Sequence, residues 1–324
     1  MDWGSVMKGY KAYIKLERGL SLNSSEAYLR DVAKLRDYAI NECGGGAPEA
    51  LDAHQILSFV SWLSKSGLDV RSQARTISGI KSFYKFMLLE DLIAEDPTEL
   101  LETPKLGRYL PDVLSREEII ACLEGVDLSS DFGYRDRAIL EMLYACGLRV
   151  SELTDLRWSR LILDPGLIRV SGKGNKERLV PVGEHALAAL EHHKRFTQTQ
   201  AQFGHEDFIF LNFQGKRLSR VSVFQIVKKY CAKAGIRKTV SPHTFRHSFA
   251  THLVEAGAGL RLVQTLLGHE SITTTDIYTH LDLDYLRETI LNCHPLHKRN
   301  RVQIPPAEQL QNANDVLIPS AVGT

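Results

Sequence analysis

The chain has 324 residues, 44% of them hydrophobic, and its 40 basic residues nearly balance 39 acidic ones for a net charge of +1. This composition predicts a globular protein with two domains, and it excludes a polyanion-binding surface spread over the whole molecule, so any nucleic-acid surface must be local. No apolar run approaches the ~20 residues needed to cross a bilayer, and no signal peptide is recognisable, so we expect a cytoplasmic protein without a membrane partner.

Residues 1–103 contain apolar residues at helical spacing and no convincing strand. Helices are predicted in VMKGYKAYI, SEAYLRDVAKLRDYAI, HQILSFVSWLSKSG and SQARTISGIKSFYKFMLLE. The stretch NECGGGAP, residues 41–48, forms a flexible break between the second and third of these segments. We therefore predict an all-helical first domain.

One face of the last of these helices is rich in cations and hydroxyls when the sequence is projected at about 100° per residue. The arc contains Arg71, Arg75, Ser78, Ser82 and Lys85. Two interpretations are open: a solvated face, which is the more common arrangement, or a surface that lies against DNA phosphates.

A linker is predicted over residues 104–114, which are rich in proline and glycine and have neither a helical nor a strand period. The second domain is expected over residues 115–294. Ser115 and Glu118 have the spacing of a capping box and mark the start of its first helix. The five cysteines are scattered without a CxxC pair, so neither a disulfide framework nor a cysteine zinc site is expected.

A strong helix, GYRDRAILEMLYAC, is predicted to end at Gly147, because glycine adopts the positive φ of a helix C-terminus without penalty. Arg149 follows directly. Residues 167–182, LIRVSGKGNKERLVPV, have two β-branched runs around a Gly-rich turn, which predicts a β-hairpin with Lys173 near its turn. The turn lacks the GxxxxGK[ST] pattern, so ATP is not implied.

The stretch HTFRHSFATHL follows an N-cap serine and an N1 proline, and it predicts a helix. His243, Arg246 and His247 share one side of it, with phenyl rings roughly opposite. The four-residue spacing of His243 and His247 would suit a zinc ion, but Arg246 beside them and the lack of a third ligand argue against a metal. An anion such as phosphate fits better.

Further along, LRLVQTLLG predicts a helix that ends at Gly268, with His269 directly after it. Tyr278 lies in the next predicted helix, which Ser271 caps. Taken alone, Tyr278 is more commonly a core aromatic than a nucleophile.

Six of these positions together resemble the signature of the tyrosine recombinases in order and spacing. They are Arg149 in GLRVSEL, Lys173 in SGKGNKERLVPV, His243 and Arg246 in HTFRHSFATHL, His269 in LLGHESITTT and Tyr278 in DIYTH. ERGLSLNSSEAYLRDV resembles the start of the core-binding domain of the Xer branch of that family, and the resemblance covers about residues 5–294. It implies a mainly α fold with a small β-sheet, in which an all-helical N-terminal core-binding domain precedes an α+β catalytic domain.

The resemblance also implies a reaction. Arg149 and Arg246 would clamp the scissile phosphate, with a further hydrogen bond from His269, and Tyr278 would attack the phosphorus. Lys173 would protonate the departing 5′-oxygen, and His243 would assist deprotonation of the tyrosine. The product is a 3′-phosphotyrosyl intermediate on the way to a Holliday junction. Because the phosphodiester energy is conserved, no cofactor, metal or ATP is expected.

The partner implied by the resemblance is a double-stranded recombination site, bound by a homo- or hetero-tetramer on two duplexes. The implied role is Xer-type chromosome dimer resolution near the nucleoid, with a possible second Xer recombinase and an activating cell-division protein. An integrase of a mobile element and a catalytically silent DNA-binding homologue remain alternatives.

The segment after the proposed nucleophile has an apolar stripe at helical spacing, comprising Leu283, Leu286, Ile290 and Cys293. Periodicity leaves open whether this helix docks on its own domain or on a neighbour. The resemblance favours a neighbour, with the tetramer assembled through residues 283–293. Residues 295–324 have no period and are expected to form a flexible tail.

Overall fold

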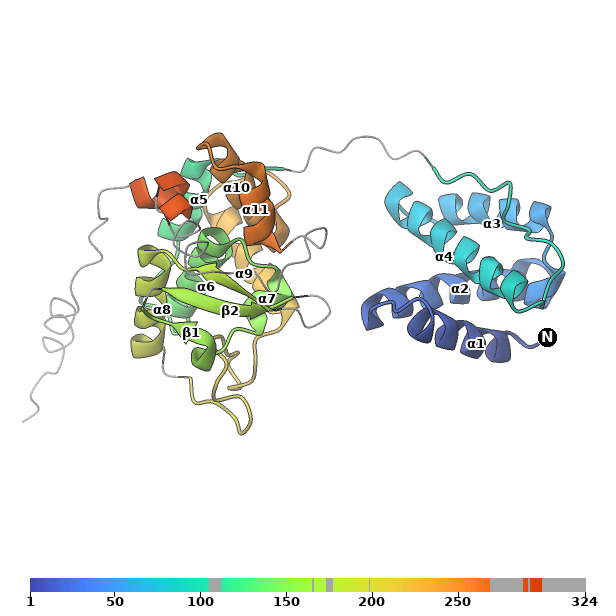
Figure 1. The fold of residues 1–324 in the computed structure, drawn as a ribbon, viewed down its shortest axis with the longest axis horizontal. Coiled ribbons are helices and arrows are strands. Elements are labelled where there is room, and N and C mark those ends of the chain that lie inside the picture. Colours follow the sequence, from blue (N-terminus) through green and yellow to red (C-terminus); the bar gives the residue numbers. More distant parts are fainter. Residues whose placement is uncertain are drawn as a thin grey trace, which may run out of the picture. The chain divides into compact units, whose positions relative to one another are not determined.

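The computed structural model describes residues 1–104, 112–164, 166–172, 177–197, 199–268, 288–290 and 292–298. The chain divides into two compact units, Met1–Leu110 and Pro111–Thr324 (Figure 1). Helices dominate both units, and the described strands form one small sheet in the second unit. The predicted fold class is confirmed.

Residues 1–104 of the first unit contain helices and no strand. Its helices are α1 (Trp3–Leu16), α2 (Leu22–Glu42), α3 (Ala53–Lys65) and α4 (Val70–Leu89), with a 3-10 turn, η1 (Pro48–Ala50), between α2 and α3. Each α-helix begins at a side chain that accepts a backbone N–H, which satisfies donors that the first turn leaves without partners. These caps are Asp2, Ser21, Asp52 and Asp69. All four predicted helical segments are confirmed.

Aromatic rings fill much of the core of the first unit. Tyr10 of α1 is fully buried and meets Phe83 of α4 edge to face, with ring centroids 5.3 Å apart. Where α2 crosses α4, the buried Asp31 forms an ion pair with Arg75 and accepts a hydrogen bond of 3.1 Å from Thr76. Asp31 thus fixes α2 against α4 through polar contacts inside the helical unit.

The second unit combines helices with an antiparallel sheet. Its helices are α5 (Arg116–Glu124), α6 (Gly133–Cys146), α7 (Val150–Thr154), η2 (Trp158–Arg160), α8 (Glu184–Phe196), α9 (Arg220–Lys233), α10 (Pro242–Glu255), α11 (Leu260–Leu267) and η4 (Pro295–Lys298). The strands are β1 (Leu161–Ile162), β2 (Leu167–Ser171) and β3 (Glu177–Pro181), in the order β1-β2-β3. Leu167 pairs with Pro181 and Ser171 with Glu177, which confirms the predicted hairpin.

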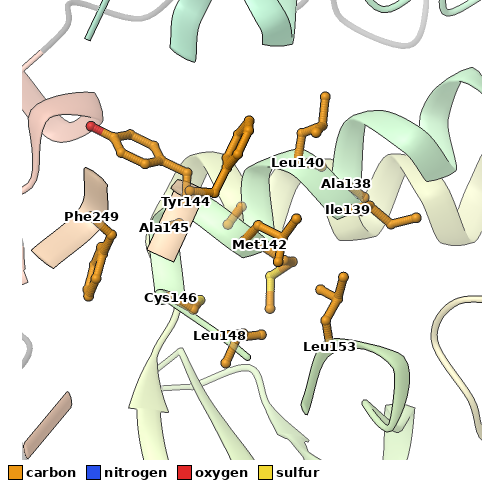
Figure 2. Packing of buried hydrophobic residues seen from close by; sticks show 14 of the residues in the cluster. Ala138, Ile139, Leu140, Met142, Tyr144, Ala145, Cys146, Leu148, Leu153 and Phe249 are labelled. Atoms are coloured by element: carbon orange, nitrogen blue, oxygen red, sulfur yellow. The ribbon is translucent and has the colours of Figure 1, made fainter. Parts of the chain in front are cut away.

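Helix α6 is the centre of the second unit, since eight of its residues between Ala138 and Cys146 are buried in one cluster, together with Leu148 just beyond the helix. It packs against α8 and α10. Figure 2 shows Phe249 of α10 beside the last turn of α6, near Tyr144 and Cys146. This packing holds the end of α6, from which Arg149 follows, against the helix that carries Arg246.

The predicted ends of the described helices of the second unit are confirmed at Ser115, Gly147 and Gly268, while Ser271 lies outside the described residues. Ser115 and Glu118 form the capping box of α5, with bonds of 3.2 and 2.7 Å to each other's backbone N–H. Gly147 after α6 and Gly268 after α11 have φ of 56° and 64°, the left-handed conformation that glycine adopts without strain. No described helix is long and apolar enough to cross a bilayer.

The described part of the C-terminal segment packs on its own unit. Ile290 is 2% exposed and belongs to the core cluster, and Cys293 packs against that cluster. His294 is buried with its ring 4.8 Å from the ring of Tyr144. Leu283 and Leu286 lie outside the described residues. For Ile290 and Cys293, the own-domain alternative therefore holds in this structure.

The junction between α6 and Arg149 depends on Gly147. A Cβ at this position would lie 2.4 Å from Phe249, in addition to the strain of its φ. We expect Gly147→Ala to lower the free energy of unfolding by about 2–4 kcal/mol, the sum of left-handed strain and overpacking. Urea unfolding of the full chain measures this loss.

Gly235→Ala is the matched control, because Gly235 also has a positive φ, 73°, but an added Cβ would meet no atom within 4 Å. It should cost only the backbone strain, about 1–2 kcal/mol. Equal losses for the two variants would contradict the packing of Phe249 against this turn.

Candidate active site

A hollow of about 560 Å³ opens in the second unit at the start of α7, α9 and α10. Its lining includes Arg149, Arg220, Phe224, His243, Arg246 and His247. Three predicted catalytic residues, Arg149, His243 and Arg246, thus come together although almost 100 residues separate the first from the other two. Lys173, His269 and Tyr278 lie outside the described residues.

Arg149 and Arg246 share a buried carboxylate, Glu152, which is 3% exposed. Arg149 donates from Nη1 to Glu152 Oε1 at 2.9 Å and from its backbone N–H to Oε2 at 2.8 Å. Arg246 Nη1 lies 3.8 Å from Oε2. A third arginine, Arg178 of β3, donates from Nη1 and Nη2 to the two oxygens at 2.6 and 3.0 Å. Glu152 therefore holds three guanidinium groups together.

The end of α11 supplies three further acceptors to the same arginines. The carbonyls of Leu266, Leu267 and Gly268 accept from Arg178, Arg246 and Arg149 at 3.1, 2.5 and 2.9 Å, respectively. Such carbonyls at a helix C-terminus have no partner inside the helix and carry partial negative charge. The arginines thereby fix the residue that immediately precedes His269.

The guanidinium groups of Arg149 and Arg246 retain donors for a ligand. An arginine has five N–H groups. In the described structure, Arg149 uses two of them, for Glu152 and Gly268, and Arg246 uses two, for the carbonyls of Gly147 and Leu267. The rest can serve the hollow, whose wall both side chains form.

The charge balance of this cluster favours an anion. Burial, followed by the positive charge of Arg149, lowers the pKa of Arg246 to about 10, so the group stays charged near neutral pH. Burial would raise the pKa of Glu152, but hydrogen bonds and charge from Arg178 and Arg149 outweigh it, so its pKa is lowered and it stays ionised. Three positive charges against one negative charge leave a positive site.

His243 stands in the first turn of α10, behind the N-cap Ser241 and Pro242. Burial, followed by the positive charge of Arg246, lowers the pKa of His243. A lowered pKa keeps this imidazole neutral near pH 7, so one ring nitrogen can accept a proton. The site thus combines cationic donors with a neutral base.

The other histidines of α10 have different surroundings. His252 is buried, and its Nδ1 lies 2.9 Å from the hydroxyl of Tyr144. His247 borders the hollow. Among the described residues, no group of three His, Cys, Asp or Glu side chains is placed to hold a metal ion.

Several residues of this region escaped the sequence analysis. Glu152 follows Arg149 by three residues, and its reciprocal bond to the Arg149 backbone N–H could have been inferred from that spacing. Arg178 gives no local signal, because its partners lie 26 and 88 residues away. Arg220 and the half-exposed Phe224 lie on the first turns of α9 and border the hollow.

The predicted cationic face of α4 is only partly exposed. Arg71 and Lys85 are exposed, but Ser82 is buried and accepts a hydrogen bond of 3.1 Å from Arg18. Arg75 forms an ion pair with the buried Asp31. Helical projection placed Ser82 on the right arc of α4 but could not show that the chain after α1 covers it.

Comparison with known proteins identifies the class that this fold and site define. Residues 113–284 match the phage integrase family, and residues 7–91 match the N-terminal SAM-like domain of phage integrases. The chain belongs to this family of tyrosine-type site-specific DNA recombinases. Within it the chain is XerD-like, being 44% identical over 299 residues to tyrosine recombinase XerD of Staphylococcus epidermidis, over 90% of this chain and 99% of that relative. The resemblance to the Xer branch is confirmed.

Solved structures share the fold. The XerH site-specific recombinase bound to palindromic difH substrate has a TM-score of 0.66 at 23% identity, covering 88% of this chain and 84% of that one. A lambda integrase tetramer bound to a Holliday junction has a TM-score of 0.65 at 18% identity, covering 85% and 80%.

Glu152 should make stability depend on pH. Its pKa is lowered in the folded chain, so its contribution is present above the ordinary carboxylate pKa and is lost as the pH falls through the lower folded value. We expect Glu152→Gln to lower the free energy of unfolding by about 2–3 kcal/mol at pH 7, the scale of a charged hydrogen bond.

The deficit of Glu152→Gln should shrink as the pH falls below the ordinary carboxylate pKa of about 4.3, and it should disappear below the lower folded value, where Glu152 of the folded parent chain also takes up a proton. Urea unfolding at several pH values measures it, with the exposed Glu184→Gln as the control. A deficit that stays constant down to acid pH would show that the ionised carboxylate is not what holds the arginines.

Proposed function

We propose that this recombinase cuts and rejoins DNA through a 3′-phosphotyrosyl intermediate on Tyr278 and a Holliday junction, and that it thereby resolves chromosome dimers. The observation that carries the proposal is the positively charged arginine cluster around Glu152, which lines an open hollow next to a neutral histidine. Phosphate is the ligand that such a cluster fits best, because guanidinium forks match phosphate oxygens.

Arg149 and Arg246 bind the two non-bridging oxygens of the scissile phosphate in this proposal. Charge grows on these oxygens as the phosphorus becomes pentavalent, so fixed donors stabilise the transition state more than the ground state. Contacts with Glu152 and with the end of α11 hold both guanidinium groups before DNA arrives. The site therefore needs little reorganisation when the reaction begins.

The other roles complete the proton transfers. Tyr278 attacks the phosphorus, and His243, whose pKa is lowered by burial and by Arg246, takes up the phenolic proton. Lys173 protonates the departing 5′-oxygen, and His269 donates to a phosphate oxygen. The phosphotyrosyl bond conserves the energy of the phosphodiester, so the strand can be rejoined without ATP or a metal ion.

The DNA partner and the assembly follow from the same proposal. The solved relatives are a XerH recombinase on its difH substrate and a lambda integrase tetramer on a Holliday junction. We propose that residues 1–103 form the core-binding domain, with Arg71, Arg75 and Lys85 near phosphates, and that residues 115–294 form the catalytic domain. The 283–293 segment joins four protomers on two duplexes, with a second Xer recombinase and an activating cell-division protein as further partners.

The packing of Ile290 and Cys293 on their own unit limits which residues of the 283–293 segment can dock on a neighbouring protomer. A segment whose end is anchored in its own core can reach a neighbour only through its earlier residues or by releasing that anchor. Residues 283–287 are therefore the part that would dock on the next protomer first.

The nucleophile is tested with Tyr278→Phe in the full chain. This variant should bind the duplex as the parent chain does but form no covalent adduct, because it lacks the hydroxyl and keeps the phosphate-binding arginines. Denaturing gels of a nicked recombination site measure the adduct, and gel shifts measure binding. An adduct that survives denaturation with the variant would exclude Tyr278 as the nucleophile.

A further inference from the structure

Arg178 is a buried arginine outside the predicted catalytic set. It is the second residue of β3, pairs with Val170 across the hairpin, and is 8% exposed. A buried guanidinium is costly unless its donors find fixed acceptors. Arg178 is therefore expected to have fixed acceptors beyond the strands that it joins.

All three nitrogens of its guanidinium are engaged. Nη1 and Nη2 form the two-pronged contact with Glu152 at 2.6 and 3.0 Å, and Nε donates to the carbonyl of Leu266 at 3.1 Å. The backbone of Gly268 lies against the same group, since a Cβ there would be 3.2 Å from its Cδ, Cζ and Nε. One side chain thus connects β3, α7 and the end of α11.

Glu152 depends on this contact for its orientation. Its Oε1 accepts from both Arg178 and Arg149, at 2.6 and 2.9 Å, and its Oε2 accepts from Arg178 and from the Arg149 backbone. Rotating the carboxylate to follow a displaced Arg178 would pull it from Arg149. The position of Arg149 therefore depends on Arg178, because Arg178 orients the carboxylate that Arg149 contacts.

We infer that Arg178 is a positioning residue that couples the β2–β3 hairpin to the arginine cluster and to the end of α11. The inference rests on the proposed function and deepens it. Lys173 precedes Arg178 by five residues in the same hairpin, and His269 directly follows the glycine packed against its guanidinium. Arg178 thereby sets the base of the hairpin that carries the general acid relative to the groups that bind the phosphate.

The test compares Arg178→Lys with Arg137→Gln. Lysine keeps the positive charge beside Glu152 but cannot replace three directed N–H groups. Arg137 is a matched control, because it also contacts a buried carboxylate, Glu141, and a backbone carbonyl, that of Leu123, within the same unit. Those partners lie on α6 and α5 and not in the arginine cluster.

Cleavage is measured on two nicked duplexes, one with the natural 5′-oxygen and one with sulfur at that bridging position. Sulfur leaves without protonation, so Lys173→Ala should fail on the oxygen substrate and recover on the sulfur substrate. Arg178→Lys should bind both duplexes as the parent chain does and cleave the oxygen substrate about 10²-fold more slowly, the cost of a misplaced group.

The sulfur substrate should restore part of the cleavage rate that Arg178→Lys loses, because a sulfur leaving group needs no general acid. The rest of the loss should remain, because the displaced arginines still bind the phosphate poorly. Urea unfolding of each variant separates this effect from lost stability, and Arg137→Gln should cleave both substrates like the parent chain after correction for its folded fraction. Parental cleavage by Arg178→Lys, or the same loss on both substrates, would overturn the coupling. Failure of the parent chain to form any adduct would instead overturn the proposed function.

Discussion

The ionised carboxylate of Glu152 is the contact on which the arrangement of the active site depends. Three guanidinium groups cannot be brought together in a half-buried place without a counter-charge, because their mutual repulsion grows as water is excluded. Glu152 supplies that charge and also directs it, since each of its oxygens accepts from more than one arginine donor. It neutralises only part of the cluster and leaves the hollow attractive to a phosphate.

The surrounding fold brings helix ends to this carboxylate. Gly147 and Gly268 stop α6 and α11 with left-handed turns, and the carbonyls near both turns accept from the arginines. The packing of α10 on α6 then determines how far Arg246 lies from Arg149. The proposed chemistry thus depends on carbonyl groups at the ends of α6 and α11 as well as on the residues that would touch DNA.

Local features of the chain were predictable from the sequence because they rest on neighbouring residues. The capping box of Ser115, the glycine stops and the β-hairpin each have a short-range signal, and the structure confirms them. The helical pattern of HTFRHSFATHL indicated an anion site at His243 and Arg246, and the family resemblance added Arg149. The structure places all three around one hollow.

Contacts between distant segments were not predictable in the same way. The bonds from Arg178 to Glu152 and Leu266 join residues far apart in sequence, and Arg178 occupies an ordinary position in a strand. Helical projection likewise could not show that Arg18 covers Ser82, or that Ile290 enters the core of its own unit. Such outcomes depend on which surfaces meet, which a periodic pattern does not specify.

The central claim is that Glu152 holds arginines in place to neutralise charge on the scissile phosphate. The most direct test uses a duplex in which a neutral methylphosphonate replaces that phosphate. On ordinary DNA, Arg246→Ala should slow cleavage by about 10²-fold, the scale for one fixed donor to a developing oxyanion. On the methylphosphonate most of that loss should disappear, because the charge that Arg246 neutralises is gone. The same loss on both duplexes would contradict the account and make Arg246 a part of the scaffold alone.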